Sequence, residues 1–232
     1  MAKFSPLPFQ KEAIDELKET FVRLWNNPDR QLPLVLKSPT GSGKTFTSAS
    51  FINELNGLPN WDEDKAFIWI TFSDDLTMQS KDKFQEYFRN ALKNNLLTVN
   101  DINNGKLRKN DILFLNWQKL VSRAAENRIL RRPENPDERK ESGNYWEDFI
   151  DKTHEEGREI ILIVDEVHKN RTTALAQEIV DYINPKIIYG ISATPSNEDE
   201  LNTRRYNSFI EVPRQRVVDE GLIKKKIVVT PN

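Results

Sequence analysis

Short apolar segments rich in β-branched and aromatic residues recur along the chain, each followed by a polar turn and a longer stretch with helical spacing. The apolar segments span residues 32–36, 66–71, 111–115, 160–164 and 186–191. They are continuous rather than alternating, which is typical of strands covered on both faces by helices. The stretches with helical spacing span 44–56, 76–94 and 172–183. This order predicts an α/β fold in which a mostly parallel β-sheet lies between helices, with right-handed crossovers.

The second helical stretch is predicted to bury one face. The residues of that face are Leu76, Phe84, Phe88 and Leu92. Two segments interrupt the alternation: 101–110 is polar and ends in a turn, and the charge-dense 123–143 is predicted to be a surface insertion. In an open parallel sheet, ligands bind at the carboxyl ends of the strands. The residues that follow each strand are therefore the first candidates for a functional site.

Composition excludes several kinds of chemistry. The chain has no cysteine, so disulfides, thiolate nucleophiles and cysteine-based metal sites are excluded. With only His154 and His168, it cannot build a multi-histidine metal cage. A net charge of −2 argues against tight electrostatic wrapping by nucleic acid, but not against a local binding groove. The longest apolar run, 160–164, is too short to span a bilayer, and the N-terminus lacks an apolar signal core, so we expect a cytoplasmic protein without membrane partners.

A glycine-containing loop separates the first predicted strand from the first helical stretch, with the sequence SPTGSGKT from Ser38 to Thr45. Its glycines would let backbone N–H groups approach phosphate oxygens at a helix N-terminus, where the helix dipole favours negative charge. Lys44 would reach the β- and γ-phosphates, and the Thr45 hydroxyl would bind Mg²⁺. The predicted nucleotide contacts are Thr40, Gly41, Ser42, Gly43, Lys44 and Thr45.

Ser38 occupies the position at which the general phosphate-loop pattern has glycine. We expect this departure to affect the turn more than the phosphate contacts. An ordinary turn with a fortuitous GKT sequence is the alternative interpretation. It is disfavoured because strand, loop and helix follow one another in the order that phosphate binding requires.

The most apolar segment of the chain, IILIV, ends directly at the acidic pair Asp165-Glu166. Carboxylates at the end of a buried strand are costly unless a cation or hydrogen bonds satisfy them. Asp165 would hold Mg²⁺ through its water shell, and Glu166 would orient and polarise the attacking water. The rival pair, Asp74-Asp75, directly precedes a helical stretch and is predicted to lie at that helix N-terminus.

Residues 165–168 form a DExH box, and SATP at 192–195 follows the next predicted strand. Together with the phosphate loop, these motifs resemble the first motor domain of superfamily 2 helicases and translocases of the DEAD/DEAH type, which has a RecA-like fold. The resemblance extends over essentially the whole chain. The segments NWQKL at 116–120 and GLIKKK at 221–226 look most like the restriction subunits of type III restriction enzymes.

The resemblance implies ATP hydrolysis with Mg²⁺, coupled to movement along nucleic acid. It implies that Gln10 contacts adenine, although Gln10 could instead cap the first turn of its helix. It also assigns His168 to the catalytic group with Lys44, Asp165 and Glu166, linking hydrolysis to Ser192 and Thr194. A locally bonded residue at a helix start is the alternative for His168. His154 has no partner pattern and is expected to be a solvated surface residue.

Contacts to a nucleic-acid backbone can come from hydroxyls and amides as well as from lysine. The candidates are Thr71, Gln79, Asn116 and Gln118. Trp117 could stack on a base, or it could close the edge of the core. The arginines at 128, 131 and 132 could touch phosphate, although a solvated insertion explains them better.

Residues 1–212 are predicted to form the ATP-binding domain, and 213–232 a connector toward a second RecA-like domain that the sequence lacks. Because that domain would supply arginine fingers, we expect weak hydrolysis from this domain alone. The expected partners are DNA in preference to RNA, the second RecA-like domain and a methyltransferase subunit. Two alternatives stay open: a nucleotide-gated binding module without processive activity, and an RNA helicase domain of the same superfamily. A small-molecule kinase is disfavoured because SATP would have no role in it.

Overall fold

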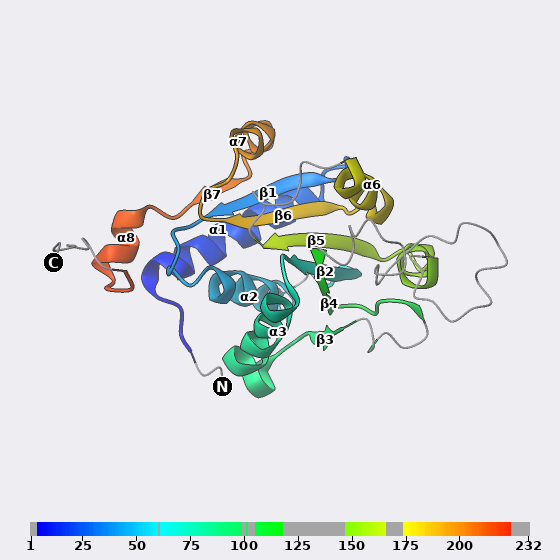
Figure 1. Cartoon of the computed structure of the whole chain (residues 1–232), viewed down its shortest axis with the longest axis horizontal. Helices are drawn as coiled ribbons and strands as arrows, with labels where there is room; N and C mark the ends of the chain where they lie inside the picture. Colours follow the sequence, from blue (N-terminus) through cyan, green and yellow to red (C-terminus); the bar gives the residue numbers. More distant parts are fainter. Residues whose placement is uncertain are drawn as a thin grey trace, which may run out of the picture.

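A parallel β-sheet forms the centre of the computed structural model, which describes residues 4–59, 61–98, 101, 105–117, 147–165 and 174–223 (Figure 1). Within these residues the sheet has seven strands in the order β3-β4-β2-β5-β6-β1-β7, and all the pairings are parallel. The strands are β1 (Leu32–Lys37), β2 (Lys65–Thr71), β3 (Asn95–Leu97), β4 (Asp111–Asn116), β5 (Glu159–Asp165), β6 (Ile187–Ser192) and β7 (Phe209–Glu211). The predicted α/β fold with a parallel sheet is confirmed.

Helices cover both faces of this sheet (Figure 1). The described helical elements are α1 (Pro8–Trp25), α2 (Lys44–Leu55), α3 (Asp74–Phe88), η1 (Arg89–Ala91), η6 (Glu147–Asp151), α5 (Lys152–Glu155), α6 (Ala174–Ile183), α7 (Asn197–Arg204) and α8 (Arg214–Asp219). Alternate strand residues point into two separate cores. One core joins the sheet to α1, α2, α3 and α8, and the other joins it to η6 and α6.

Five predicted strands match observed ones to within one residue at either end, because both of their faces are buried. In β2, β4 and β6 every residue is buried. The short edge strands β3 and β7 were not predicted, since each has only three residues and lacks a continuous apolar run.

The predicted buried face of the second helical stretch is wrong at Leu76, whose exposed fraction is 43%. The buried residues of α3 are Thr77, Ser80, Phe84 and Phe88. Leu76 lies eight positions before Phe84, which places it about 80° away around the helix axis. The helix also ends earlier than predicted, at Phe88, because Arg89 has a positive φ of 44° and a 3₁₀ turn follows.

The predicted polar segment 101–110 also buries an apolar residue, since Leu107 is fully buried in the core beneath α6. The charge-dense insertion predicted at 123–143 lies outside the described residues. None of the helices in the described part of the chain is long and apolar enough to cross a membrane.

Candidate nucleotide-binding site

The candidate residues of the predicted site lie together at the carboxyl ends of the parallel strands. The last residues of β4 and β2, Asn116 and Thr71, are register partners. Asp165 ends β5, the next strand in the sheet, and Ser192 ends β6 beside it. Ser192 in turn pairs with Lys37, the residue that precedes the phosphate loop. Parallel strands place their carboxyl ends together, so motifs far apart in sequence are brought to the same edge.

Hydrogen bonds made by Ser38 and Ser42 stabilise the phosphate loop. The Ser38 amide donates to the Ser192 carbonyl at 3.0 Å, which continues the pairing of β1 with β6 beyond the end of β1. The hydroxyls of Ser38 and Ser42, both buried, share a hydrogen bond of 2.6 Å. Ser38 replaces the glycine of the general pattern. Its hydroxyl restrains the turn of the loop, which is where we expected this replacement to have its effect.

Both loop glycines have conformations that favour glycine. Gly41 and Gly43 each have a φ of +83°, a left-handed region that other residues occupy at a cost. At Gly43 a Cβ atom would also lie only 2.7 Å from Nε2 of Gln10. Gly43 is the N-cap of α2, which begins at Lys44. The loop thus leads directly into a helix N-terminus, where unpaired N–H groups and the helix dipole favour an anion.

Gln10 connects the first helix to the phosphate loop. Its side chain is 5% exposed. Oε1 accepts a hydrogen bond from the Leu7 amide at 3.0 Å, and Nε2 donates one to the Ser42 carbonyl at 2.9 Å. The capping role considered for Gln10 is thus present, together with a loop contact that the sequence did not indicate. A primary amide has a second hydrogen and a second lone pair, so the predicted adenine contact is compatible with both bonds.

A buried hydroxyl pair joins α2 to the sheet behind Lys44. The Tyr189 hydroxyl on β6 and the Ser48 hydroxyl on α2 lie 2.8 Å apart, and both side chains are fully buried. Burial raises the pKa of Tyr189 far above its ordinary value, and the negative charge of nearby Asp165 adds to this effect. The sequence analysis missed this link. A tyrosine inside a buried strand does indicate that a hydrogen-bond partner is needed, but not which one.

The turn after β6 is fixed by Ser192. Its buried hydroxyl accepts a hydrogen bond from the Thr194 amide at 3.0 Å, while the Thr194 side chain is exposed. Glu166 and His168 lie outside the described residues, so their catalytic and coupling roles stay predictions.

Two candidate nucleic-acid contacts, Thr71 and Asn116, are buried, with exposed fractions of 2% and 5%. The Thr71 hydroxyl bonds to the Thr77 hydroxyl at 2.6 Å and donates to the Ser73 carbonyl at 3.1 Å. Asn116 Nδ2 donates to Asp74 Oδ1 at 3.0 Å. In this structure both side chains therefore attach the first turn of α3 to the ends of β2 and β4.

The other residues predicted near the carboxyl ends of the strands differ in their surroundings. Gln79 on α3 is exposed, and Gln118 lies outside the described residues. Trp117 is 3% exposed and belongs to the core beneath α6, which confirms the core alternative. Ser73 is the N-cap of α3, with Asp74 and Asp75 in the first turn, as the helix-terminus interpretation of this acidic pair predicted.

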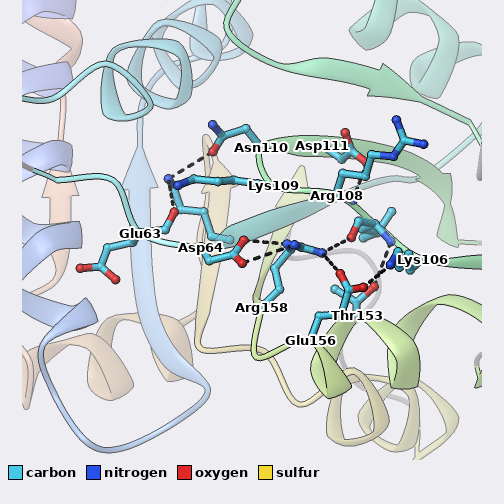
Figure 2. Close-up of polar contacts among 12 residues, drawn as sticks. Glu63, Asp64, Lys106, Arg108, Lys109, Asn110, Asp111, Thr153, Glu156 and Arg158 are labelled. Atoms are coloured by element: carbon cyan, nitrogen blue, oxygen red, sulfur yellow. Dashed lines mark hydrogen bonds and ion pairs between the residues drawn. The ribbon is translucent and has the colours of Figure 1, made fainter.

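The amino ends of the strands, opposite the candidate site, carry an ion-pair network (Figure 2). Arg158, just before β5, binds Asp64 with an Nε–Oδ1 distance of 2.7 Å and Glu156 with an NH1–Oε2 distance of 3.0 Å. Its NH1 also donates to the Leu107 carbonyl at 2.6 Å, and Lys106 pairs with Glu156. These groups bind one another across the amino ends of β2, β4 and β5, so this end of the sheet is stabilised internally.

His154 was expected to be solvated, and this is wrong. Its ring Nε2 lies 2.9 Å from the Ile183 carbonyl at the end of α6, and the side chain is partly buried. The ring therefore satisfies one of the carbonyls that a helix C-terminus leaves unpaired. Sequence spacing gave no sign of this contact, because the two residues are 29 positions apart.

The family model of the type III restriction enzyme, res subunit, matches the chain over residues 3–197. The chain belongs to this family. The family match and the parallel α/β sheet together agree with the predicted RecA-like fold. No curated protein matches the chain.

Several solved helicases are similar to the chain at low identity. The UvsW helicase from bacteriophage T4 is 18% identical, with a TM-score of 0.47 over 90% of this chain and 59% of its own. The Hef helicase domain from Pyrococcus furiosus is 13% identical, with a TM-score of 0.49 over 89% of this chain and 38% of its own. A hypothetical ATP-dependent RNA helicase from Sulfolobus tokodaii is 17% identical, with a TM-score of 0.48 over 90% and 54%. The chain thus spans less than two thirds of each of these proteins.

Proposed function

We propose that this domain binds ATP with Mg²⁺ at the carboxyl edge of the sheet. In the longer protein, hydrolysis would drive movement along DNA in a restriction system. The observation that carries the proposal is the loop from Ser38 to Gly43. Its two glycines have a φ of +83°, its serines are bonded to each other, and it leads into the N-terminus of α2. This geometry suits a polyphosphate better than any other ligand class.

The residues around the loop fit a magnesium–nucleotide. Thr45 in the first turn of α2 and Asp165 at the end of β5 offer a hydroxyl and a carboxylate, the hard oxygen donors that Mg²⁺ prefers. The ion would neutralise charge on the phosphates, and Lys44 would bind their β- and γ-oxygens. Glu166, the residue after Asp165, would orient the attacking water.

Coupling to movement would pass through the end of β6. Ser192 is bonded both to the phosphate loop, through its carbonyl, and to the following turn, through its hydroxyl. A change at the phosphates can therefore reach Thr194 through two hydrogen bonds. His168 would complete the connection to the hydrolysis site.

We propose DNA in preference to RNA as the track, and a methyltransferase subunit as a partner, as the resemblance to restriction subunits implies. A second RecA-like domain would supply arginine fingers, which are worth about 10³–10⁵ in rate. We therefore expect slow hydrolysis from the 232-residue chain alone. Gln79 is exposed on α3, and we propose that it contacts a nucleic-acid backbone.

The proposal is tested by ATP binding and by polynucleotide-stimulated hydrolysis. Lys44→Ala should abolish ATP binding measured by calorimetry, whereas Lys109→Ala, which replaces a lysine that binds Asp62 near the amino ends of the strands, should leave it unchanged. Glu166→Gln should retain binding while stopping turnover. In the longer protein, duplex DNA should stimulate hydrolysis more than RNA does. Hydrolysis that is insensitive to duplex DNA, single strands and RNA alike would contradict the motor proposal and favour a nucleotide-gated binding module.

A further inference from the structure

The segment after β7 folds back over the nucleotide-binding side of the domain. The Val212 amide donates to the Lys37 carbonyl at 2.8 Å, immediately before the phosphate loop. In α8, Val217 is fully buried in the core formed with α1 and α2. Arg216 binds both carboxylate oxygens of Glu12 on α1, at 2.7 and 2.8 Å. The start of the predicted connector is therefore packed against this domain.

A glycine turn then directs the chain back toward the phosphate loop. Gly221 follows the C-cap of α8 with a φ of +74°. Its amide donates to the Val218 carbonyl at 2.9 Å, and the Leu222 amide donates to the Val217 carbonyl at 3.2 Å. These two bonds form a Schellman motif, which ends a helix and reverses the chain direction. Gly221, singled out in the GLIKKK segment, thus determines where the next two side chains lie.

Ile223 lies against the phosphate loop. A Cβ atom at Gly41 would lie only 2.9 Å from the Cγ2 methyl of Ile223. The methyl therefore occupies the side of Gly41 from which a side chain would project. Two residues further along the loop, Gln10 approaches Gly43 in the same manner, at 2.7 Å. The amide of Gln10 therefore lies beside Gly43, and the methyl of Ile223 lies beside Gly41.

We propose that Ile223 forms an apolar wall of the nucleotide site and packs against the nucleoside part of ATP. This inference rests on the proposed function and adds to it a residue from the connector. A methyl group cannot donate a hydrogen bond to phosphate, so the parts of ATP with which Ile223 can make a favourable contact are the base and the ribose. Ligand sites combine apolar walls with a few polar groups that fix orientation. Gln10 supplies the polar group and Ile223 the wall.

The test compares ATP with inorganic tripolyphosphate, which carries the same phosphates without a nucleoside. Affinities of the 232-residue chain for both are measured by calorimetry with Mg²⁺. Ile223→Ala should weaken ATP binding about fivefold to tenfold, the loss expected when a few tens of Å² of apolar contact disappear. Tripolyphosphate affinity should be unchanged. Ile223→Val retains the Cγ2 methyl and should bind ATP as the unaltered chain does.

Leu222→Ala is the matched control, because Leu222 is the neighbouring apolar residue and is 44% exposed. It should leave both affinities unchanged. Equal weakening of ATP and tripolyphosphate by Ile223→Ala would overturn the proposal, since it would show that Ile223 only supports the loop. Unchanged ATP binding in Ile223→Ala would overturn it as well. If the unaltered chain binds neither ligand, the proposed function itself fails, and the inference fails with it.

Discussion

Lys65, the first residue of β2, is a buried cation far from the candidate site. It is 1% exposed, and within the described residues its Nζ donates to the Glu63 carbonyl and the Asn110 side-chain oxygen, both at 3.3 Å. The centroid of the Trp61 ring lies 4.5 Å from the same nitrogen. Burial lowers the pKa of Lys65 from 10.5 to about 8, and the positive charge of Lys109 adds to this effect. The folded chain therefore binds this proton less tightly than the unfolded chain does.

The sign of the pH dependence follows from this lowered pKa. Between pH 8 and 10.5 the unfolded chain binds more protons at Lys65 than the folded chain, so this residue makes the free energy of unfolding rise with pH. Below pH 8 the charged side chain costs about 3 kcal/mol relative to a neutral one, at about 1.4 kcal/mol for each factor of ten in proton affinity. Lys65→Met removes that cost and loses two weak hydrogen bonds worth about 1 kcal/mol together. We expect the variant to be more stable by about 2 kcal/mol at pH 7.

The assay is urea unfolding, followed by far-ultraviolet circular dichroism at pH 7 and at pH 9.5. The gain from Lys65→Met should shrink toward zero at the higher pH, because the lysine is then largely neutral in the folded state. Other groups titrate over the same range, but they cancel in the difference between the two proteins.

Lys186→Met is the matched control. Lys186 is also buried, at 9% exposure, but its Nζ donates to the Asn27 and Asp29 carbonyls at 2.5 and 3.0 Å. Its removal should destabilise the fold by about 2 kcal/mol, because two partly buried hydrogen bonds from a charged donor are lost. A difference between Lys65→Met and the unaltered chain that does not change with pH would refute the argument from burial.

Two further variants test the contacts behind the phosphate loop. Tyr189→Phe should lower the free energy of unfolding by about 1–2 kcal/mol, because the buried Ser48 hydroxyl loses its partner; a double-mutant cycle with Ser48→Ala should show coupling, and additive effects would contradict the link. Gln10→Ala should lower the free energy of unfolding by about 1–2 kcal/mol and weaken ATP binding, because the Leu7 amide and the Ser42 carbonyl lose their bonds. Urea unfolding and calorimetry measure both effects, and unchanged ATP affinity would show that Gln10 acts only as a helix cap.

The central strands could be predicted from the sequence because their burial on both faces appears as uninterrupted apolar runs. In β5 the run from Ile160 to Val164 is buried throughout. The edge strand β7 could not be predicted in this way. Its residues Phe209 and Glu211 are only partly buried or exposed, and the strand is held by pairing with Val35 to Lys37 of β1. Such short strands depend on partners that no local pattern reveals.

The motifs predicted which residues gather at the site, but not where each side chain points. Thr71 and Asn116 have the chemistry of ligand contacts, yet the structure bonds both to residues of the α3 N-terminus. A hydroxyl or amide can bind within the chain or bind a ligand, and spacing alone does not distinguish the two. Ile223 was missed as a site residue because it reaches Gly41 only through the turn at Gly221.

The polar side chains behind the phosphate loop explain how this loop is suited to an anion. Ser38 and Ser42 bind each other, and Gln10 binds the Ser42 carbonyl, so these groups do not compete with a ligand for the N–H groups of the loop. The same bonds restrain the conformation of the loop, and such restraint lowers the ordering cost of binding. A serine in place of the usual first glycine is consistent with this role, because glycine at position 38 would remove the bond to Ser42. The departure from the general pattern therefore restrains the turn of the loop.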